Sequence, residues 1–156
     1  SRLAIARPKA ARERSELLML PEFQHRLRVY IEDTDAGGIV YYVNFLKFME
    51  RARTEWLRSM GFDHYLVSEE PVFFVVRRAE VDYRQPARLD DDLLACAEVI
   101  KIGKASLHFR QRILRDGVEI ASGLIEVACV DRHHLKPRAL PSTLSALLTH
   151  ALENVT

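Results

Sequence analysis

The sequence lacks several features that would assign a protein class directly. It holds two cysteines among 156 residues, Cys96 and Cys129, which lie far apart in apolar stretches without a CxxC spacing. We therefore expect two buried, reduced thiols rather than a disulfide or a catalytic cysteine. No apolar run approaches the ~18 residues of a membrane span. The apolar tract at residues 17–20 is shorter than the roughly 7–15 residues of a signal-peptide core. These absences favour a cytoplasmic protein.

The sequence also lacks an excess of positive or negative charge. The chain has 23 basic and 22 acidic residues, so its formal net charge is +1. Such a balance creates no overall field that would attract nucleic acid or an anionic membrane. Recognition of an anion would have to come from a local cluster. The length fits one domain with its own core. We expect a basic N-terminal extension over residues 1–22 and a single domain over residues 23–156.

Residues 23–32 alternate between apolar and polar side chains. A period of two is typical of a strand with one buried face. The turn-forming residues 33–38, Asp-Thr-Asp-Ala-Gly-Gly, then end the pattern. We therefore expect a half-buried strand that leads directly into a tight connection.

A helix is predicted over about residues 44–60, because apolar residues recur there at mostly three- and four-residue spacing. We expect Asn44 to cap its N-terminus, Gly61 to end it and Trp56 to lie in the core. The apolar stripe consists of Val43, Leu46, Met49, Ala52, Trp56, Leu57 and Met60.

The rest of the chain predicts a meander of long strands and a C-terminal helix that begins near Ser142. The pair Asp116-Gly117 is a hairpin turn signal between two of these strands. One strand, one helix that is apolar on most sides and then a run of strands indicate an α+β domain. The expected strands cover residues 72–83, 93–102, 106–114 and 118–130.

The connection between the first strand and the helix holds the residues best suited to chemistry. Glycines let the backbone turn tightly and approach a ligand. Free N–H groups at a helix start favour an anion or a developing oxyanion. A carboxylate beside them adds a nucleophile or a base for acyl transfer. Taken alone, acids and glycines in such a connection are also ordinary turn residues.

The run Glu-Asp-Thr-Asp-Ala-Gly-Gly-Ile-Val-Tyr at residues 32–41 and the run Glu-Arg-Ala-Arg-Thr-Glu at residues 50–55 resemble the 4-hydroxybenzoyl-CoA thioesterase-like hotdog family. Three further pieces are similar to its Tol-Pal-associated, YbgC-type acyl-CoA thioesterase branch. They are Phe-Val-Val-Arg-Arg at 74–78, Pro-Ala-Arg-Leu-Asp-Asp at 86–91 and Lys-Pro-Arg-Ala-Leu-Pro at 136–141. The resemblance covers about residues 26–147.

The resemblance implies an antiparallel sheet wrapped around a long central helix, paired into dimers and often tetramers with active sites between subunits. It implies hydrolysis of an acyl-CoA, or of a thioester on acyl carrier protein, without a cofactor. Asp35 matches the family's catalytic carboxylate, and the backbone N–H of Tyr42 matches the group that polarises the thioester carbonyl. Many YbgC-type members have a histidine where this chain has Tyr42, which puts a side-chain acid or base role there in doubt.

Two helix residues are assigned to substrate binding. Glu50 matches an acidic family position that faces the acyl pocket, and Val43 belongs to the same helix. The alternative for Glu50 is an ion pair with Arg53, which lies three residues on and is therefore its neighbour on the helix surface. Asp33, by contrast, is expected to be a structural turn acid rather than a catalyst.

The phosphates of coenzyme A require local cations. Lys104, at a strand–strand turn together with Lys101, is our preferred contact, and the alternative, a solvated turn lysine, is slightly favoured. Arg77 is a further candidate. Because Arg77 and Arg78 are adjacent on a strand, we expect them to point to opposite faces, so that only one can reach the nucleotide.

Three alternative functions or sites were considered for these residues. A metal site at His133-His134 lacks a recognised ligand spacing, so we expect none. An enoyl-thioester hydratase would need a histidine in the catalytic segment, and no histidine lies between His25 and His64. A non-catalytic acyl-CoA binder or scaffold is the third, and release of free CoA distinguishes it from an enzyme.

Overall fold

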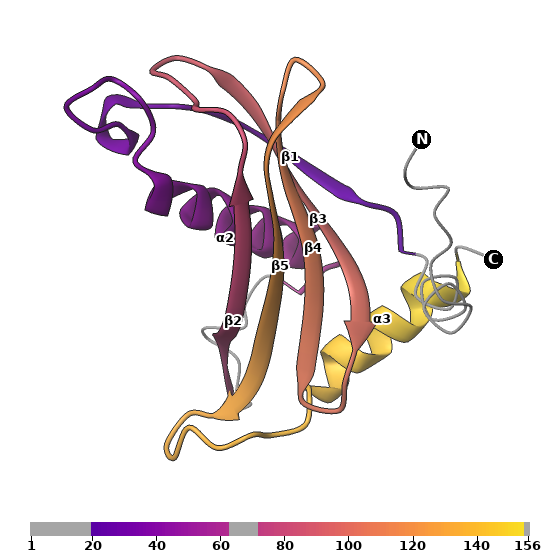
Figure 1. Cartoon of the computed structure of the whole chain (residues 1–156). Coiled ribbons are helices and arrows are strands. Elements are labelled where there is room, and N and C mark those ends of the chain that lie inside the picture. The colour runs from indigo at the N-terminus through magenta and orange to yellow at the C-terminus, as the bar shows by residue number, and fades with distance from the viewer. Residues whose placement is uncertain (1–19, 63–71, 155–156) are drawn as a thin grey trace, which may run out of the picture.

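The computed structural model describes residues 20–62 and 72–154. Most of the predicted basic extension lies outside these residues. In chain order the elements are β1 (Phe23–Arg28), a 3-10 helix (Ile31–Asp33), α2 (Tyr42–Ser59), β2 (Val72–Tyr83), β3 (Asp92–Ile102), β4 (Ser106–Arg115), β5 (Val118–Asp131) and α3 (Ser142–Glu153). Figure 1 shows their arrangement.

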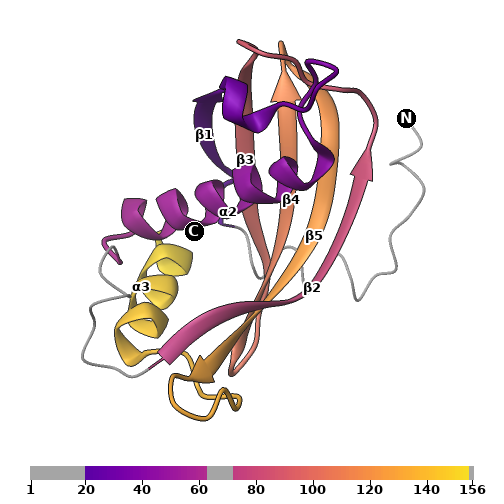
Figure 2. The same cartoon turned by 90° about the vertical axis from the view of Figure 1, so that its left-hand side faces the viewer.

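The five strands form one antiparallel sheet in the order β1-β3-β4-β5-β2. The sheet curves around α2, and Figure 2 shows α2 and α3 on the same side of it. This arrangement confirms the predicted α+β architecture. The hairpin predicted at Asp116-Gly117 is also confirmed, because both residues have positive φ angles of 51° and 77°, as a two-residue hairpin loop requires.

β1 is shorter than predicted, since it ends at Arg28 rather than continuing to Glu32. Phe23, His25 and Leu27 show the expected half-buried face. The chain then turns because the Asp33 carboxylate accepts the Tyr30 N–H at 2.9 Å. This contact closes the 3-10 helix, and it leaves Ile31 77% exposed. A local side-chain hydrogen bond here competes with continuation of the strand.

The prediction that Asn44 caps α2 is wrong. The helix begins at Tyr42, and Tyr41 occupies the N-cap position without a side-chain cap. Asn44 is buried inside the first turn, where its side chain serves a tertiary contact instead. The predicted stop is confirmed at Gly61, whose φ of 87° is the left-handed conformation typical of a helix end.

The core lies between α2, α3 and the inner face of the sheet. Trp56 is buried, as predicted, with its ring 5.4 Å from the Phe109 ring. Gln111 is fully buried, and its Nε2 donates to the Met49 carbonyl of α2 at 2.8 Å. Opposite it, Gly123 leaves room for close approach, because a Cβ there would lie 3.3 Å from the Met49 sulfur. The Gln111–Met49 hydrogen bond and the absence of a side chain at Gly123 together allow α2 to pack closely on the sheet.

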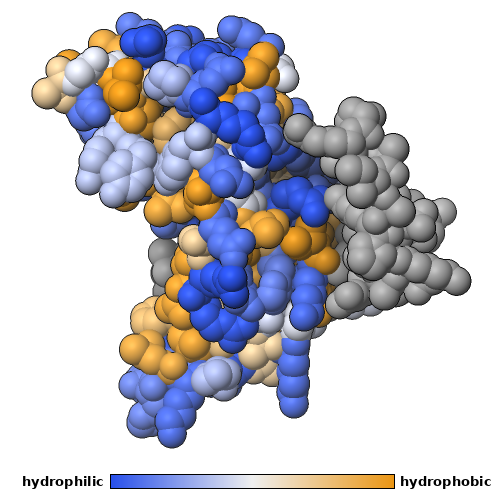
Figure 3. All heavy atoms as spheres, viewed as in Figure 1, coloured by the Kyte–Doolittle hydropathy of each residue, from blue (hydrophilic) through white to orange (hydrophobic). Residues whose placement is uncertain are grey.

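The outer face of the sheet, seen in Figure 3, carries many hydrophilic side chains. Ion pairs cross it between the strands and the residues that flank them. They include Arg84–Glu119 at 3.1 Å and Arg112–Glu22 at 2.6 Å. The two cysteines are free and buried, which confirms the prediction. Burial, aided by the nearby Glu22 carboxylate, raises the pKa of the Cys96 thiol to about 11.

Candidate active site

The loop before α2 presents Asp35 to solvent. Its Oδ1 accepts a hydrogen bond from the Gly37 N–H at 2.8 Å. The Gly38 N–H donates to the Asp35 carbonyl at 3.0 Å, and the Asp35 N–H donates to the Ile39 carbonyl at 2.9 Å. Gly38 has a φ of 78°, which glycine adopts without steric cost. The turn therefore holds an exposed carboxylate in one orientation.

Tyr42 is the first residue of α2, so its N–H has no acceptor within the helix. Such an N–H, at the positive end of the helix dipole, favours an anion or a developing oxyanion. The Tyr42 side chain is 57% exposed, and its ring lies 5.0 Å from the Tyr41 ring. The structure thus places the carboxylate of Asp35 and this amide in one short segment, seven residues apart.

Asp33 has the structural contacts expected of it. It is 4% exposed, and its two oxygens accept from different partners. Oδ2 accepts the Tyr30 N–H at 2.9 Å, and Oδ1 accepts the Asn44 side-chain amide at 3.0 Å. The Asp33 carbonyl also accepts the Tyr41 N–H at 3.1 Å. Asp33 therefore joins the entry and the exit of the loop that carries Asp35.

Tyr83, the last residue of β2, is a member of the site that sequence reasoning missed. Its ring lies 5.9 Å from the Tyr42 ring and 5.6 Å from the Phe45 ring. Burial raises the pKa of Tyr83, and the neighbouring Tyr42 raises it further. An aromatic residue at a strand end is common in a protein core, so its sequence pattern alone carried no signal of this position.

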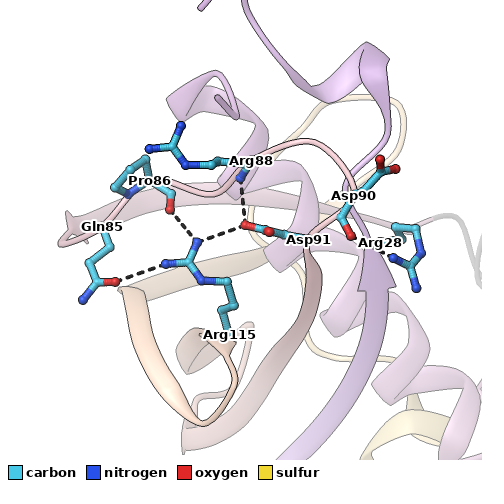
Figure 4. Close-up of polar contacts among 7 residues, drawn as sticks. All are labelled: Arg28, Gln85, Pro86, Arg88, Asp90, Asp91 and Arg115. Atoms are coloured by element: carbon cyan, nitrogen blue, oxygen red, sulfur yellow. Dashed lines mark hydrogen bonds and ion pairs between the residues drawn. The ribbon is translucent and has the colours of Figure 1, made fainter. Parts of the chain in front are cut away.

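The loop at residues 85–91 supports the same segment from the other side. The Val40 N–H donates to the Ala87 carbonyl at 2.7 Å, and Ile39 forms an isolated bridge with Arg88. Ala87 is fully buried and Val40 is 4% exposed. Figure 4 shows the polar contacts within this loop, in which Arg115 of β4 is central. Part of the resemblance motif Pro-Ala-Arg-Leu-Asp-Asp thus contacts the chain just before α2.

A cavity of about 230 Å³ lies between α2 and the sheet on the side of β2. Glu50 and Arg53 lie on its wall, and Arg53 Nη1 donates to Gln111 Oε1 at 2.8 Å. Val43 is not among the lining residues and lies about two helical turns toward Asp35, or roughly 10 Å. The lining residues are Glu50, Arg53, Thr54, Leu57, Phe74, Val76, Leu107, Phe109 and Val127.

The prediction that Arg77 and Arg78 point to opposite faces is wrong. The register between β2 and β5 shifts between Val76 and Arg78, so Arg77 is an extra, bulged residue. Arg78 lies opposite Glu126, and Arg77 Nη2 donates to Glu126 Oε1 at 2.6 Å. Both guanidinium groups therefore lie on the outer face that carries Glu126. The hydrogen bond from Arg77 lowers the pKa of Glu126.

Lys104 lies in the turn between β3 and β4 and is exposed. Its carbonyl accepts the Leu140 N–H at 3.0 Å. This turn lies at the end of the sheet where β2 begins, whereas the loop before α2 lies at the end where β2 stops (Figure 1). The 12 residues of β2 span about 40 Å at roughly 3.3 Å per residue. One chain therefore does not bring Lys104 and Asp35 together.

Within residues 20–62 and 72–154, no three His, Cys, Asp or Glu side chains gather as a metal site requires. His133 and His134 are both exposed. Among the helices described, none is long and apolar enough to cross a membrane.

Comparisons with known proteins give this geometry a family. The profile of the thioesterase-like superfamily matches residues 29–148. The chain is 42% identical over 129 residues to an acyl-CoA thioesterase YbgC of Haemophilus influenzae, which covers 82% of this chain and 95% of that protein. It is 45% identical over 125 residues to the acyl-CoA thioester hydrolase YbgC of Escherichia coli, which covers 80% and 93%.

The fold has a close counterpart among solved structures. A probable thioesterase from Bartonella henselae superposes with a TM-score of 0.73 at 33% identity, covering 78% of this chain and 100% of that one. The antiparallel sheet wrapped around α2 is thus the hotdog fold. With its match over residues 29–148 and its YbgC relatives, the chain belongs to the thioesterase-like superfamily.

Proposed function

We propose that this thioester hydrolase acts on acyl-CoA and that Asp35 carries the reaction. The observation that supports it is the exposed Asp35 carboxylate, which the Gly37 N–H holds in place. Seven residues later, at the start of α2, the Tyr42 N–H has no acceptor within the helix. A carboxylate that attacks, or that activates water, needs a donor to stabilise the oxyanion that forms. The Tyr42 N–H is that donor.

The acyl group and the thioester have separate places in this proposal. The thioester carbonyl lies against the start of α2 near Val43, and a short-chain aliphatic or aromatic acyl group enters the cavity lined by Glu50. Asp35 then acts as nucleophile, through an acyl-enzyme anhydride that water hydrolyses, or as general base on water. Either course releases the free acid and the coenzyme A thiol.

The assembly follows from the edge of the sheet. β2 is an edge strand, and Val75 and Val76 on it are 39% and 50% exposed. A long strand with an open edge invites pairing with another strand. We propose a homodimer in which two β2 strands pair antiparallel across a twofold axis, with two dimers forming a tetramer. Antiparallel pairing would bring the sheet end that carries Lys104 in one copy toward Asp35 of the other.

Coenzyme A phosphates are then contacts of Lys104, with Arg77 on the outer face as a further cation. Acyl carrier protein is an alternative donor, because it presents its acyl group on the same phosphopantetheine thiol. Two buried free thiols suit a reducing compartment, so we place the protein in the cytoplasm.

Asp35→Asn tests this proposal, because it keeps the shape and removes both nucleophile and base. We expect kcat for release of CoA from an acyl-CoA to fall by at least roughly 10²-fold. Asp116→Asn makes the same chemical change in the exposed hairpin turn between β4 and β5, outside the loop that carries Asp35, and should leave kcat unchanged. Undiminished turnover in folded Asp35→Asn would exclude Asp35. Acyl-CoA binding by the unaltered protein without release of CoA would indicate a binder.

A further inference from the structure

Arg115, the last residue of β4, has a guanidinium group directed into the 85–91 loop (Figure 4). Its Nη1 donates to the Pro86 carbonyl at 2.7 Å and to Asp91 Oδ2 at 3.0 Å. Its Nη2 donates to Gln85 Oε1 at 3.1 Å. Asp91 Oδ2 also accepts the Arg88 N–H at 2.9 Å. One cation therefore ties together both ends of the loop.

The loop has a second anchor, on β1. The Val29 N–H donates to the Asp91 carbonyl at 2.9 Å, and the Asp90 N–H donates to the Val29 carbonyl at 3.0 Å. Arg28 Nη1 also donates to the Asp90 carbonyl at 2.7 Å. These bonds hold the half of the loop that contains Asp90 and Asp91. The half that contains residues 85–88 is held by Arg115 and Asp91, and by one backbone bond from the Gln85 N–H to the Ile120 carbonyl at 3.2 Å.

That second half is the one that contacts the candidate active site. Ala87 accepts the Val40 N–H at 2.7 Å, and Arg88 bridges Ile39. Val40 lies five residues after Asp35 and two before Tyr42. A shift of Ala87 would therefore move the chain between the carboxylate and the helix amide.

We infer that Arg115 is a positioning residue for thioester hydrolysis, acting through Pro86 and Asp91 to hold Ala87 against Val40. The inference rests on the proposed function of Asp35 and Tyr42. Arg115 itself touches neither residue in any contact described above. Its effect is on the distance and angle between the carboxylate and the amide, which catalysis by orientation requires to be set closely.

The chain offers a matched control on the same strand. Arg112 makes a comparable ion pair with Glu22, through Nε at 2.9 Å and Nη2 at 2.6 Å. The side chains of that pair are 34% and 20% exposed, against 26% and 24% for Arg115 and Asp91. Arg112 thus resembles Arg115 in chemistry and burial, but it ties β4 to the segment before β1 rather than to the 85–91 loop.

The experiment compares Arg115→Gln with Arg112→Gln in the full chain, using steady-state release of CoA and thermal unfolding. We expect both variants to lose similar thermal stability. Arg115→Gln should lower kcat about tenfold and change KM by no more than about twofold. This loss of kcat is smaller than the roughly 10²-fold loss that a 1 Å misplacement can cause. Arg112→Gln should keep both constants. Arg115→Lys, which retains a donor cation, should recover part of kcat. Equal kcat values in the two glutamine variants would overturn the inference.

Amide hydrogen exchange gives a readout that does not depend on activity. In Arg115→Gln, the Val40 amide should exchange faster, whereas the Val29 amide, held by the other anchor, should not. Unchanged exchange at Val40 would also overturn the inference. If Arg115→Gln fails to fold, Asp91→Asn keeps an acceptor for the Arg88 N–H and should show the same two effects more weakly. If the unaltered protein releases no CoA, the proposed function fails, and exchange at Val40 still decides the positioning.

Discussion

The Asp33 carboxylate holds the side-chain amide of Asn44, with Oδ1 and Nδ2 3.0 Å apart and both residues almost fully buried. The same carboxylate accepts the Tyr30 N–H through its other oxygen. An acid eleven residues before Asn44 thus fixes the first turn of α2, a task that usually falls to a capping side chain next to the helix.

This contact predicts a reciprocal pattern of stability. Asp33→Asn places an amide N–H₂ against one of the donors that Asp33 accepts, the Tyr30 N–H or the Asn44 amide. Asn44→Asp places two carboxylates against each other. Each variant should therefore lower the unfolding free energy by about 1–3 kcal/mol. The double variant, with the two side chains exchanged, restores one donor and one acceptor and should recover most of the loss. Urea unfolding measures it, and strictly additive losses would contradict the pairing.

Tyr42 is predicted to act through its backbone. Tyr42→Phe removes the hydroxyl and keeps the N–H and the ring contacts. We therefore expect activity on aliphatic acyl-CoAs to change by less than about tenfold, or ~1.4 kcal/mol. A much larger loss in a folded variant would mean that the hydroxyl takes part in the reaction.

Lys104 is predicted to contact a coenzyme A phosphate as a point charge. Lys104→Ala should raise KM for an acyl-CoA and leave kcat nearly unchanged, because the phosphate is bound equally in the ground and transition states. The difference should shrink at high salt, which screens an exposed pair. Lys136→Ala removes a charge from a neighbouring loop and serves as the control. If Lys104→Ala matches the unaltered protein at low salt, Arg77 or Arg78 becomes the candidate.

The assembly can be measured directly. Because the proposed active site needs residues from two copies, sedimentation should show no stable monomer, with a tetramer favoured over a dimer. A fully active species at the chain mass of 18.0 kDa would be incompatible with this proposal.

We expect the stability of the protein to depend on pH through His108. Burial lowers its pKa below the usual value of about 6.5; Glu126 opposes this shift, while Lys101 and Arg77 add to it. The unfolded chain therefore binds more protons than the folded chain between the lowered pKa and about 6.5, so stability is lost as pH falls through this window. His108→Gln should flatten the dependence of Tm between about pH 7 and pH 5. His150→Gln, on the exposed side of α3, should retain it.

The period of hydrophobic residues was enough to predict the strands, α2 and the wrapped sheet, because burial on one face imposes it. The motif around Asp35 was recognised by resemblance, and the structure shows that its turn lies directly before α2. Asn44, Tyr83 and Arg115 were misassigned or missed for a common reason. Their partners, Asp33, Tyr42 and Asp91, are 11 to 41 residues away in sequence, and no local pattern indicates such contacts.

The extra residue at Arg77 has a consequence for sequence alignment. Val76 and Ala79 still face Val127 and Ile125, which are themselves two residues apart. The inserted residue therefore adds a cation to the outer face and leaves the pairing of β2 with Val127 and Ile125 of β5 in step on either side of it. A relative without it would need a one-residue gap at this position, although its core would superpose without a break. Insertions and deletions in the middle of a strand are usually taken as alignment errors. Here, a deletion of this residue would leave the pairing of β2 with β5 intact on both sides.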